Sequence, residues 1–181
     1  MTREQLAAEI YKVSYITGEF LLRSGKISNE YFDKYLFESN PILLDKISEY
    51  MIELLPSDFD LLGALEMGGI PLATLIAVKT GKPILFTRKR AKEYGTRKFA
   101  EGPDYNGKTI VVIEDVVTSG GQIILSSKEL RDTGAVIKDA VCVIDREQAG
   151  DEALNGNNIK LTSLFTMSYI KDAAKSAGYI K

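Results

Sequence analysis

The chain of 181 residues contains no histidine and no tryptophan, and only one cysteine. Without histidine, a Ser-His-Asp triad, a Cys-His dyad and any histidine-containing zinc site are excluded. A single cysteine also excludes an internal disulfide framework, and the neighbours Val141 and Val143 predict that Cys142 is a buried, unreactive thiol. Any chemistry must therefore use carboxylates, cations, phenols, backbone donors or a metal held by oxygen.

Charge and hydropathy show no extremes either. The net charge of -2 gives no general electrostatic reason to expect binding to nucleic acid or to a membrane. No apolar run approaches the roughly 20 residues of a membrane span, and the N-terminus lacks the apolar region of a signal peptide. The length suits one domain with a full core. We therefore expect a cytoplasmic protein without a nucleic-acid or membrane partner.

Hydrophobic patterning predicts strands that alternate with helices. Thr2 and Gln5 have the spacing of a capping box, so a first helix should begin there and end near residues 15–18. Extended segments at 19–24 and 29–37 should precede a helix that starts with Pro41. Further on, the pattern predicts strands at 60–67, 82–87, 109–114, 135–145 and 159–165, helices at 68–81, 122–134 and 168–177, and loops at 88–104 and 145–158. This alternation indicates an α/β fold with a mainly parallel, twisted sheet.

The stretch TIVVIEDVVTSGGQ, residues 109–122, carries the strongest functional signal. A buried strand is followed by the carboxylates of Glu114 and Asp115, then by the turn 118–121 and a helix. Ligands of open α/β sheets bind at the carboxyl ends of strands, and a glycine-rich turn before a helix offers backbone amides to an anion. Carboxylates repel phosphate but suit a sugar diol or a divalent cation. Together these features predict a site for a ribose 5-phosphate.

This stretch resembles the phosphoribosyl pyrophosphate (PRPP) motif of type I phosphoribosyltransferases. The simpler alternative is a strand–turn–helix with a solvated acidic end. The resemblance implies that family's fold, a mainly parallel sheet flanked by helices, as a single domain over residues 1–181. A small hood would be formed mainly by residues 1–40 with C-terminal contributions. It also implies that Glu114 and Asp115 hold the ribose hydroxyls, while the 5'-phosphate is bound by Val116, Val117, Thr118, Ser119, Gly120, Gly121 and Gln122.

A second motif, GPDYNGKT at residues 102–109, matches the expression for a phosphate-binding P-loop. A P-loop leaves a strand and opens a helix, whereas this segment leaves a polar loop and enters a strand. Asn106 and Gly107 are better interpreted as a tight turn. We therefore reject the nucleoside-triphosphatase alternative.

The basic segment TRKRAKEYGTRK, residues 87–98, follows the carboxyl end of a predicted strand. It could be a solvated charge run or a nucleic-acid patch, but its place and length favour a lid. Cations that close over PRPP would stabilise the charge of the departing pyrophosphate. The segment resembles the catalytic loop Arg-Lys-x-x-Lys-x-His-Gly of orotate phosphoribosyltransferases. Arg88, Lys89 and Lys92 match, which implies that Lys92 is catalytic, and Tyr94 replaces the histidine as a possible hydrogen-bond donor.

Two further segments resemble parts of a PRPP site. In GALEMGGIP, residues 63–71, backbone amides at Met67 and Gly68 could bind pyrophosphate as the corresponding family loop does, although the segment could equally be a tight crossover. Many relatives carry a lysine near Gly68, and its absence suggests that binding here depends on backbone donors. In FLLRSGKISNEYFDKYLF, residues 20–37, Arg23 occupies the place of a PRPP-binding cation in the orotate enzymes.

The orotate enzymes also imply a site for the base. Tyr31 or Phe32 would flank the flat pyrimidine, unless this aromatic segment only packs on the core. Arg146 lies in an Asp-Arg-x-x-x-Gly pattern that pairs with the carboxylate of orotate in that family, and a guanidinium fork fits a planar carboxylate. An arginine at a strand end is otherwise usually a surface residue. Thr118 would contact the base as well.

The resemblance implies an orotate phosphoribosyltransferase of de novo pyrimidine synthesis. Such an enzyme converts orotate and PRPP to orotidine 5'-monophosphate and pyrophosphate, and members of the family are usually homodimers. Mg²⁺ would be held mainly through PRPP, with Glu114 and Asp115 nearby. Two alternatives remain at this point, namely a purine phosphoribosyltransferase and a regulator that binds PRPP without catalysis.

Overall fold

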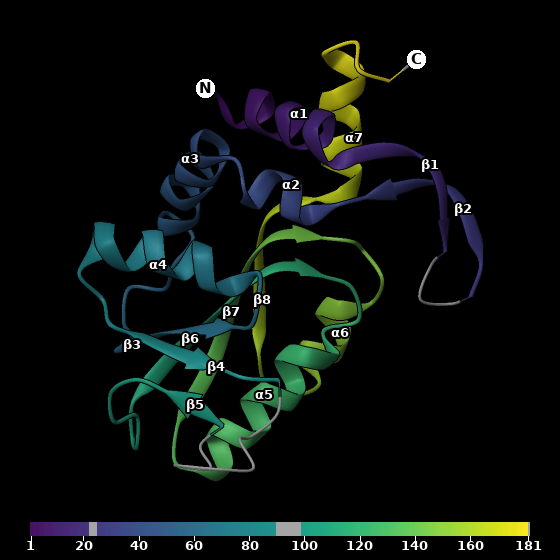
Figure 1. Cartoon of the computed structure of the whole chain (residues 1–181). Helices are drawn as coiled ribbons and strands as arrows, with labels where there is room; N and C mark the ends of the chain where they lie inside the picture. The colour runs from purple at the N-terminus through teal and green to yellow at the C-terminus, as the bar shows by residue number, and fades with distance from the viewer. Residues whose placement is uncertain (22–24, 90–98, 181) are drawn as a thin grey trace.

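The computed structural model describes residues 1–21, 25–89 and 99–180. Predictions for Arg23, Lys92 and Tyr94 therefore concern residues outside the described part of the chain. A six-stranded sheet forms the centre, in the order β5-β4-β3-β6-β7-β8 (Figure 1). Every neighbouring pair is parallel except β4 with β5, which confirms the predicted mainly parallel sheet. The strands are β3 (Leu61–Leu65), β4 (Ile84–Thr87), β5 (Ala100–Glu101), β6 (Thr109–Val117), β7 (Val136–Asp145) and β8 (Lys160–Thr166).

Alternation along the central strands creates two hydrophobic cores. Successive side chains of a strand point to opposite faces, so Val111 and Ile113 enter one core, whereas Ile110 and Val112 enter the other. The first core also contains residues of α3 (Pro41–Ile52) and α4 (Gly69–Thr80). The second contains residues of α5 (Gly121–Asp132) and α6 (Gly150–Asn155). Helices therefore cover both faces of the sheet, which places the carboxyl ends of its strands at an open edge.

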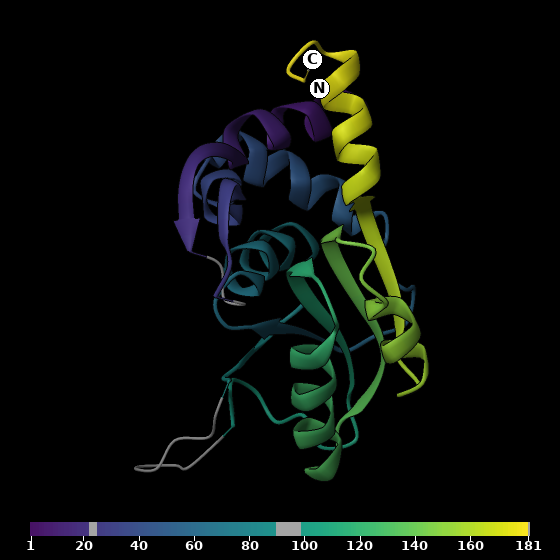
Figure 2. The same cartoon turned by 90° about the vertical axis from the view of Figure 1, so that its right-hand side faces the viewer.

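A smaller layer lies beyond that edge (Figures 1 and 2). We call it the hood, and it consists of α1 (Arg3–Ser14), the antiparallel strands β1 (Tyr15–Leu21) and β2 (Ile27–Phe32), and α2 (Lys34–Glu38). The C-terminal helix α7 (Met167–Ser176) packs against α1 and crosses it in both views. The carboxyl end of β6 lies against α2, since Asp115 of β6 pairs with Lys34 of α2. Hood and strand ends therefore face one another.

Several local predictions are confirmed. Thr2 and Gln5 form the capping box of α1, and Pro41 begins α3 with Asn40 as its cap. A left-handed Gly81 ends α4 at a φ of 73°. The segment that matched a P-loop turns at residues 106–107 and enters β6, and Cys142 is fully buried.

Other local predictions are wrong. Strand β1 begins at Tyr15, four residues earlier than predicted. The extended segment predicted for 29–37 ends at Phe32, because the Asp33 side chain accepts a hydrogen bond from the Tyr35 amide at 3.0 Å and caps α2. The predicted loops at 88–104 and 145–158 contain β5 and α6, respectively.

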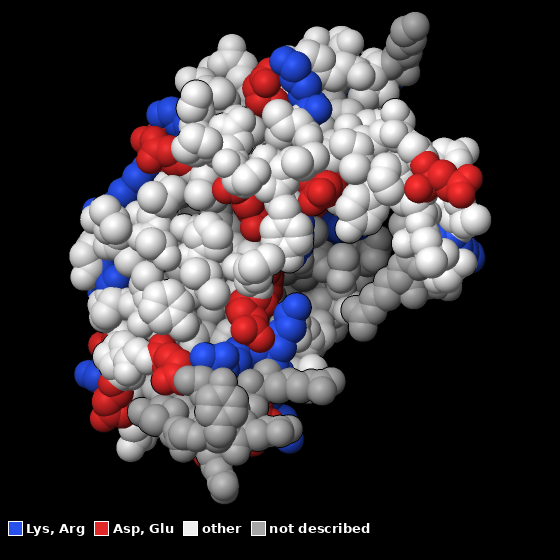
Figure 3. Space-filling model, in the orientation of Figure 1, with Lys and Arg blue, Asp and Glu red and all other residues white. Residues whose placement is uncertain are grey.

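On the face shown in Figure 3, lysine and arginine side chains are interspersed with aspartate and glutamate. Among the described residues, no helix is long and apolar enough to cross a membrane.

Candidate functional site

A pocket of about 350 Å³ lies where β6 gives way to α5, and we call it the β6 pocket. It is lined by Glu114, Val116, Val117, Thr118, Ser119, Gly120, Gly121, Gln122, Ile123 and Leu125. Gly120 holds the turn open with a φ of 70°. Gly150 of α6 packs against this turn so tightly that a Cβ at residue 150 would lie 2.6 Å from the Thr118 carbonyl oxygen. The predicted turn, Glu114 and the N-terminus of α5 therefore all line the β6 pocket.

The two carboxylates of the motif have different surroundings because β6 continues through them to Val117. Glu114 lines the β6 pocket. The side chain of Asp115 is fully buried, and its Oδ2 lies 2.5 Å from the Nζ of Lys34 in α2. Asp115 therefore faces the hood, whereas Glu114 faces the glycine-rich turn.

Burial sets the charge of this acidic cluster. It raises the pKa of Glu114 well above its ordinary value, and it raises the pKa of the neighbouring Glu38 to about 9 with help from a hydrogen bond to Asp115. Burial also acts to raise the pKa of Asp115, but hydrogen bonds from Glu38, Glu114 and Lys34 outweigh it and lower that pKa. Negative charge therefore concentrates on Asp115.

Lys34 supplies the compensating charge. Burial favours its neutral form, but the hydrogen bond and charge of Asp115 prevail and raise the pKa of the ammonium. Lys34 thus remains a cation next to the end of β6.

The loop at residues 66–69, between β3 and α4, lies against the same carboxylate. A Cβ at Gly68 would fall 1.6 Å from the Asp115 Oδ2, so only glycine fits there without rearrangement. The peptide bond between Glu66 and Met67 is cis. The Glu66 carboxylate accepts a hydrogen bond of 2.6 Å from the amide of Lys89. The loop therefore contacts Asp115 through Gly68 and the beginning of the basic segment through Glu66.

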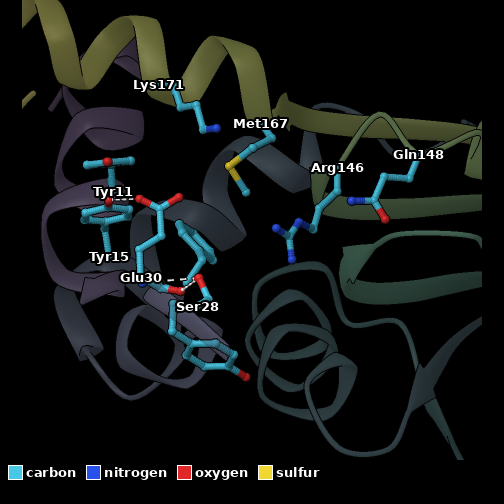
Figure 4. A pocket seen from close by; sticks show the side chains of 10 residues that line it. Tyr11, Tyr15, Ser28, Glu30, Arg146, Gln148, Met167 and Lys171 are labelled. Atoms are coloured by element: carbon cyan, nitrogen blue, oxygen red, sulfur yellow. Dashed lines mark hydrogen bonds between the residues drawn. The ribbon is translucent and has the colours of Figure 1, made fainter. Parts of the chain in front are cut away.

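A second pocket of about 450 Å³ lies between the hood and the end of β7 (Figure 4), and we call it the hood pocket. The three residues predicted to contact the base, Tyr31, Phe32 and Arg146, all line it. The Arg146 amide donates to the Val117 carbonyl at 2.9 Å, so the end of β7 is held beside the β6 pocket. Thr118 lines the β6 pocket rather than the hood pocket.

Sequence reasoning missed most of the hood pocket. Its remaining lining residues are Tyr11, Tyr15, Ser28, Glu30, Gln148, Met167 and Lys171. Figure 4 shows that Lys171 comes from α7 and that Arg146 lies across the pocket from Tyr11, Tyr15 and Glu30. Glu30 accepts a hydrogen bond from the Tyr15 hydroxyl, which raises the pKa of Tyr15 to about 12. Tyr11, Tyr15, Met167 and Lys171 belong to α1, β1 and α7, which meet only in the folded chain, whereas Ser28, Glu30 and Gln148 lie within the motif segments but were not singled out.

Comparison with known proteins agrees with this geometry. The family model for the phosphoribosyl transferase domain matches residues 37–160. The chain therefore belongs to the phosphoribosyltransferase family.

Relatives define the branch of that family. An orotate phosphoribosyltransferase of Nocardioides sp. is 48% identical over 173 residues, covering 96% of each chain. One of Methanocella arvoryzae is 40% identical over 83% of this chain and 86% of its own. The solved orotate phosphoribosyltransferase of Mycobacterium tuberculosis H37Rv in complex with Fe(III) dicitrate superposes with a TM-score of 0.82 at 26% identity, covering 93% of this chain and 98% of that one. Within the family, the chain is an orotate phosphoribosyltransferase.

Proposed function

We propose that the β6 pocket binds the ribose 5-phosphate part of PRPP and that the hood pocket binds orotate. The observation that carries this proposal is the junction of the two pockets at the ends of β6 and β7, where the Arg146 amide bonds to Val117. A ribose 5-phosphate in one pocket can therefore present its anomeric carbon to a base in the other pocket. Transfer would give orotidine 5'-monophosphate and pyrophosphate.

The 5'-phosphate would be bound by backbone amides and hydroxyls of the turn. Amides at a helix N-terminus attract an anion, and Thr118 and Ser119 add hydroxyl donors. Glu114 and Asp115 would hold the ribose hydroxyls and stabilise the positive ring of an oxocarbenium-like transition state. Orotate is already anionic, so the reaction needs no strong general base, and a chain without histidine is chemically adequate.

Pyrophosphate would be received by the 66–69 loop and the basic segment. The amides of Met67 and Gly68 are candidates on the loop, and Arg88 and Lys89 supply cations from the described part of the basic segment. The family resemblance adds Lys92 and Tyr94 to the pyrophosphate site, and Arg23 as a further cation that binds PRPP. These groups would stabilise the negative charge that develops on the leaving group.

Mg²⁺ is proposed as the cofactor. Among the described residues, no cluster of three or more potential ligands forms a metal cage. Mg²⁺ commonly keeps waters and binds through one or two carboxylates together with substrate phosphates. Glu114 and Asp115 next to a polyphosphate fit that mode, in which the ion neutralises charge on PRPP.

Homodimer formation and a cytoplasmic location are also proposed, and both rest on the family resemblance. Sedimentation at several protein concentrations tests the dimer, and a mass of one chain at all of them would contradict it.

The decisive experiment follows the loss of orotate absorbance with PRPP and Mg²⁺, beside a panel of purine and pyrimidine bases. We expect turnover of orotate and none of adenine, guanine or hypoxanthine. Turnover of a purine in place of orotate would instead support the purine phosphoribosyltransferase alternative. Purine bases have no carboxylate, so that alternative gives Arg146 no role in pairing with the base.

A further inference from the structure

Lys34 is a cation of the hood that reaches the end of β6. It opens α2, which is anchored by the Asp33 cap and by the fully buried Phe37. From this fixed turn its Nζ lies 2.5 Å from the Asp115 Oδ2. The ammonium also lies 5.2 Å from the centre of the Tyr35 ring. An ion pair and a cation–π contact therefore hold the ammonium in its position.

Within the ion pair, Lys34 is the more exposed member. The Asp115 side chain has no exposed surface, and its Oδ1 accepts the Val116 amide at 2.5 Å. The Lys34 side chain is 34% exposed. An ammonium has three donors, so pairing with one carboxylate oxygen leaves others for a further acceptor. A buried anion thus holds a partly exposed cation in place.

The cation lies next to the 66–69 loop. The Asp115 oxygen that pairs with Lys34 is the one that a Cβ at Gly68 would strike. The Lys34 ammonium and Gly68 therefore both lie next to the same Asp115 oxygen. Lys89 lies at the other side of this loop, bonded through its amide to Glu66. The Lys34 ammonium and the 66–69 loop thus lie side by side at Asp115, and a cation beside backbone donors suits a group with several negative charges.

We propose that Lys34 binds the pyrophosphate group of PRPP and that Asp115 is the positioning residue that holds its ammonium beside the 66–69 loop. This inference rests on the proposed function of the two pockets. It adds a pyrophosphate cation supplied by the hood, on an element separate from the basic segment. Binding of pyrophosphate would then link α2 to the sheet.

Calorimetric titration of wild type and Lys34→Met with three probes, each with Mg²⁺, tests the assignment. The probes are PRPP, inorganic pyrophosphate and ribose 5-phosphate. Removal of a charge-assisted hydrogen bond should weaken binding of PRPP and of pyrophosphate by roughly ten- to a hundredfold. Binding of ribose 5-phosphate should change less than about threefold, because that probe lacks the group that Lys34 contacts. Lys34→Arg should recover part of the lost pyrophosphate affinity.

Two results would overturn the assignment. Unchanged pyrophosphate affinity in Lys34→Met would remove Lys34 from that subsite. A loss confined to ribose 5-phosphate would show that Lys34 acts on the ribose through Asp115. Lys128→Met, which changes an exposed lysine of α5, is the matched control and should bind all three probes as wild type does.

Folding and the proposed function are checked separately. Urea unfolding reports whether Lys34→Met is folded. If it is not, Asp115→Asn provides the second test, since it keeps the side-chain shape but releases the ammonium, and undiminished pyrophosphate binding in it would contradict the positioning role. Failure of the proposed function would appear in the wild type, as absence of orotate turnover, whereas failure of this inference leaves that turnover intact.

Discussion

Arg146 is exposed at the carboxyl end of β7 and points into the hood pocket. A guanidinium offers a planar carboxylate two parallel hydrogen bonds, whereas an ammonium offers a single point charge. We therefore expect Arg146→Ala to raise KM for orotate roughly ten- to a hundredfold, with a smaller rise in Arg146→Lys. Steady-state kinetics at saturating PRPP measure both. An unchanged KM in the alanine variant would remove Arg146 from recognition of the base.

Glu38 gives a prediction about pH and stability. Its pKa of about 9 in the folded chain lies above the ordinary value of 4.5, chiefly because of burial. The unfolded chain therefore loses this proton first, and the folded state is destabilised progressively as pH rises from about 4.5 to 9. Glu38→Gln keeps a neutral side chain of the same shape, so the urea midpoint of the variant should fall less than that of wild type between pH 6 and 9.

Parallel pH profiles for the two proteins would contradict this assignment of Glu38. Glu114 also has a raised pKa and contributes a slope of the same sign, so only the difference between the two profiles reports Glu38. The measurement therefore needs both proteins at every pH.

At the scale of elements, α6 supports the turn of the β6 pocket. A Cβ at Gly150, the first residue of α6, would lie 2.6 Å from the Thr118 carbonyl oxygen and 2.9 Å from the Val117 Cγ1. Gly150→Ala must therefore shift α6 or the turn, at a cost of about 1–3 kcal/mol in the free energy of unfolding. We expect a several-fold weaker affinity for ribose 5-phosphate, measured by calorimetry together with urea unfolding.

The same helix provides a matched control. At Gly156, just beyond the C-terminus of α6, the nearest contact of an added Cβ is 3.4 Å, and φ is −60°. Gly156→Ala should leave affinity for ribose 5-phosphate within about twofold of wild type. Equal effects of the two substitutions would contradict the supporting role of Gly150.

Elements with strong local signals were predicted well, and those shaped by tertiary contacts were not. Five strands of the sheet and the major helices follow from hydrophobic periodicity, and α3 and α4 are bounded by Pro41 and Gly81 as expected. Helix α2 was missed because its aromatic residues favour strands, while its cap, Asp33, acts through one local hydrogen bond. Helix α6 has only six residues and no side-chain cap.

The site shows the same division. The glycine-rich turn, the acidic pair and Arg146 lie in contiguous motifs, so the sequence alone could propose them. Lys34 and Glu38 meet Asp115 only because α2 packs over the end of β6, some eighty residues away in the chain. Glu114 and Asp115 are adjacent residues of β6 and have different surroundings, so their common action on one diol stays a prediction. Their surroundings depend on how far the strand continues, which the sequence does not determine.

At the scale of the whole molecule, the sheet and the hood contribute one pocket each to a common junction. A ligand that binds only the folded state stabilises it by mass action, by about 2.7 kcal/mol at a hundred times its Kd. For a chain of this length that corresponds to a rise in Tm of roughly 5–10 °C. Orotate and ribose 5-phosphate, tested separately by thermal unfolding, should each raise Tm because they occupy different pockets.

Arg146→Ala distinguishes two separate pockets from one shared pocket. If the hood pocket binds orotate, this variant should lose the rise in Tm with orotate but keep the rise with ribose 5-phosphate. The Arg146 amide that joins β7 to Val117 is a backbone group and survives the substitution, so the β6 pocket keeps its support. Loss of both rises would mean that the two ligands share a single pocket, and loss of neither would move orotate away from Arg146.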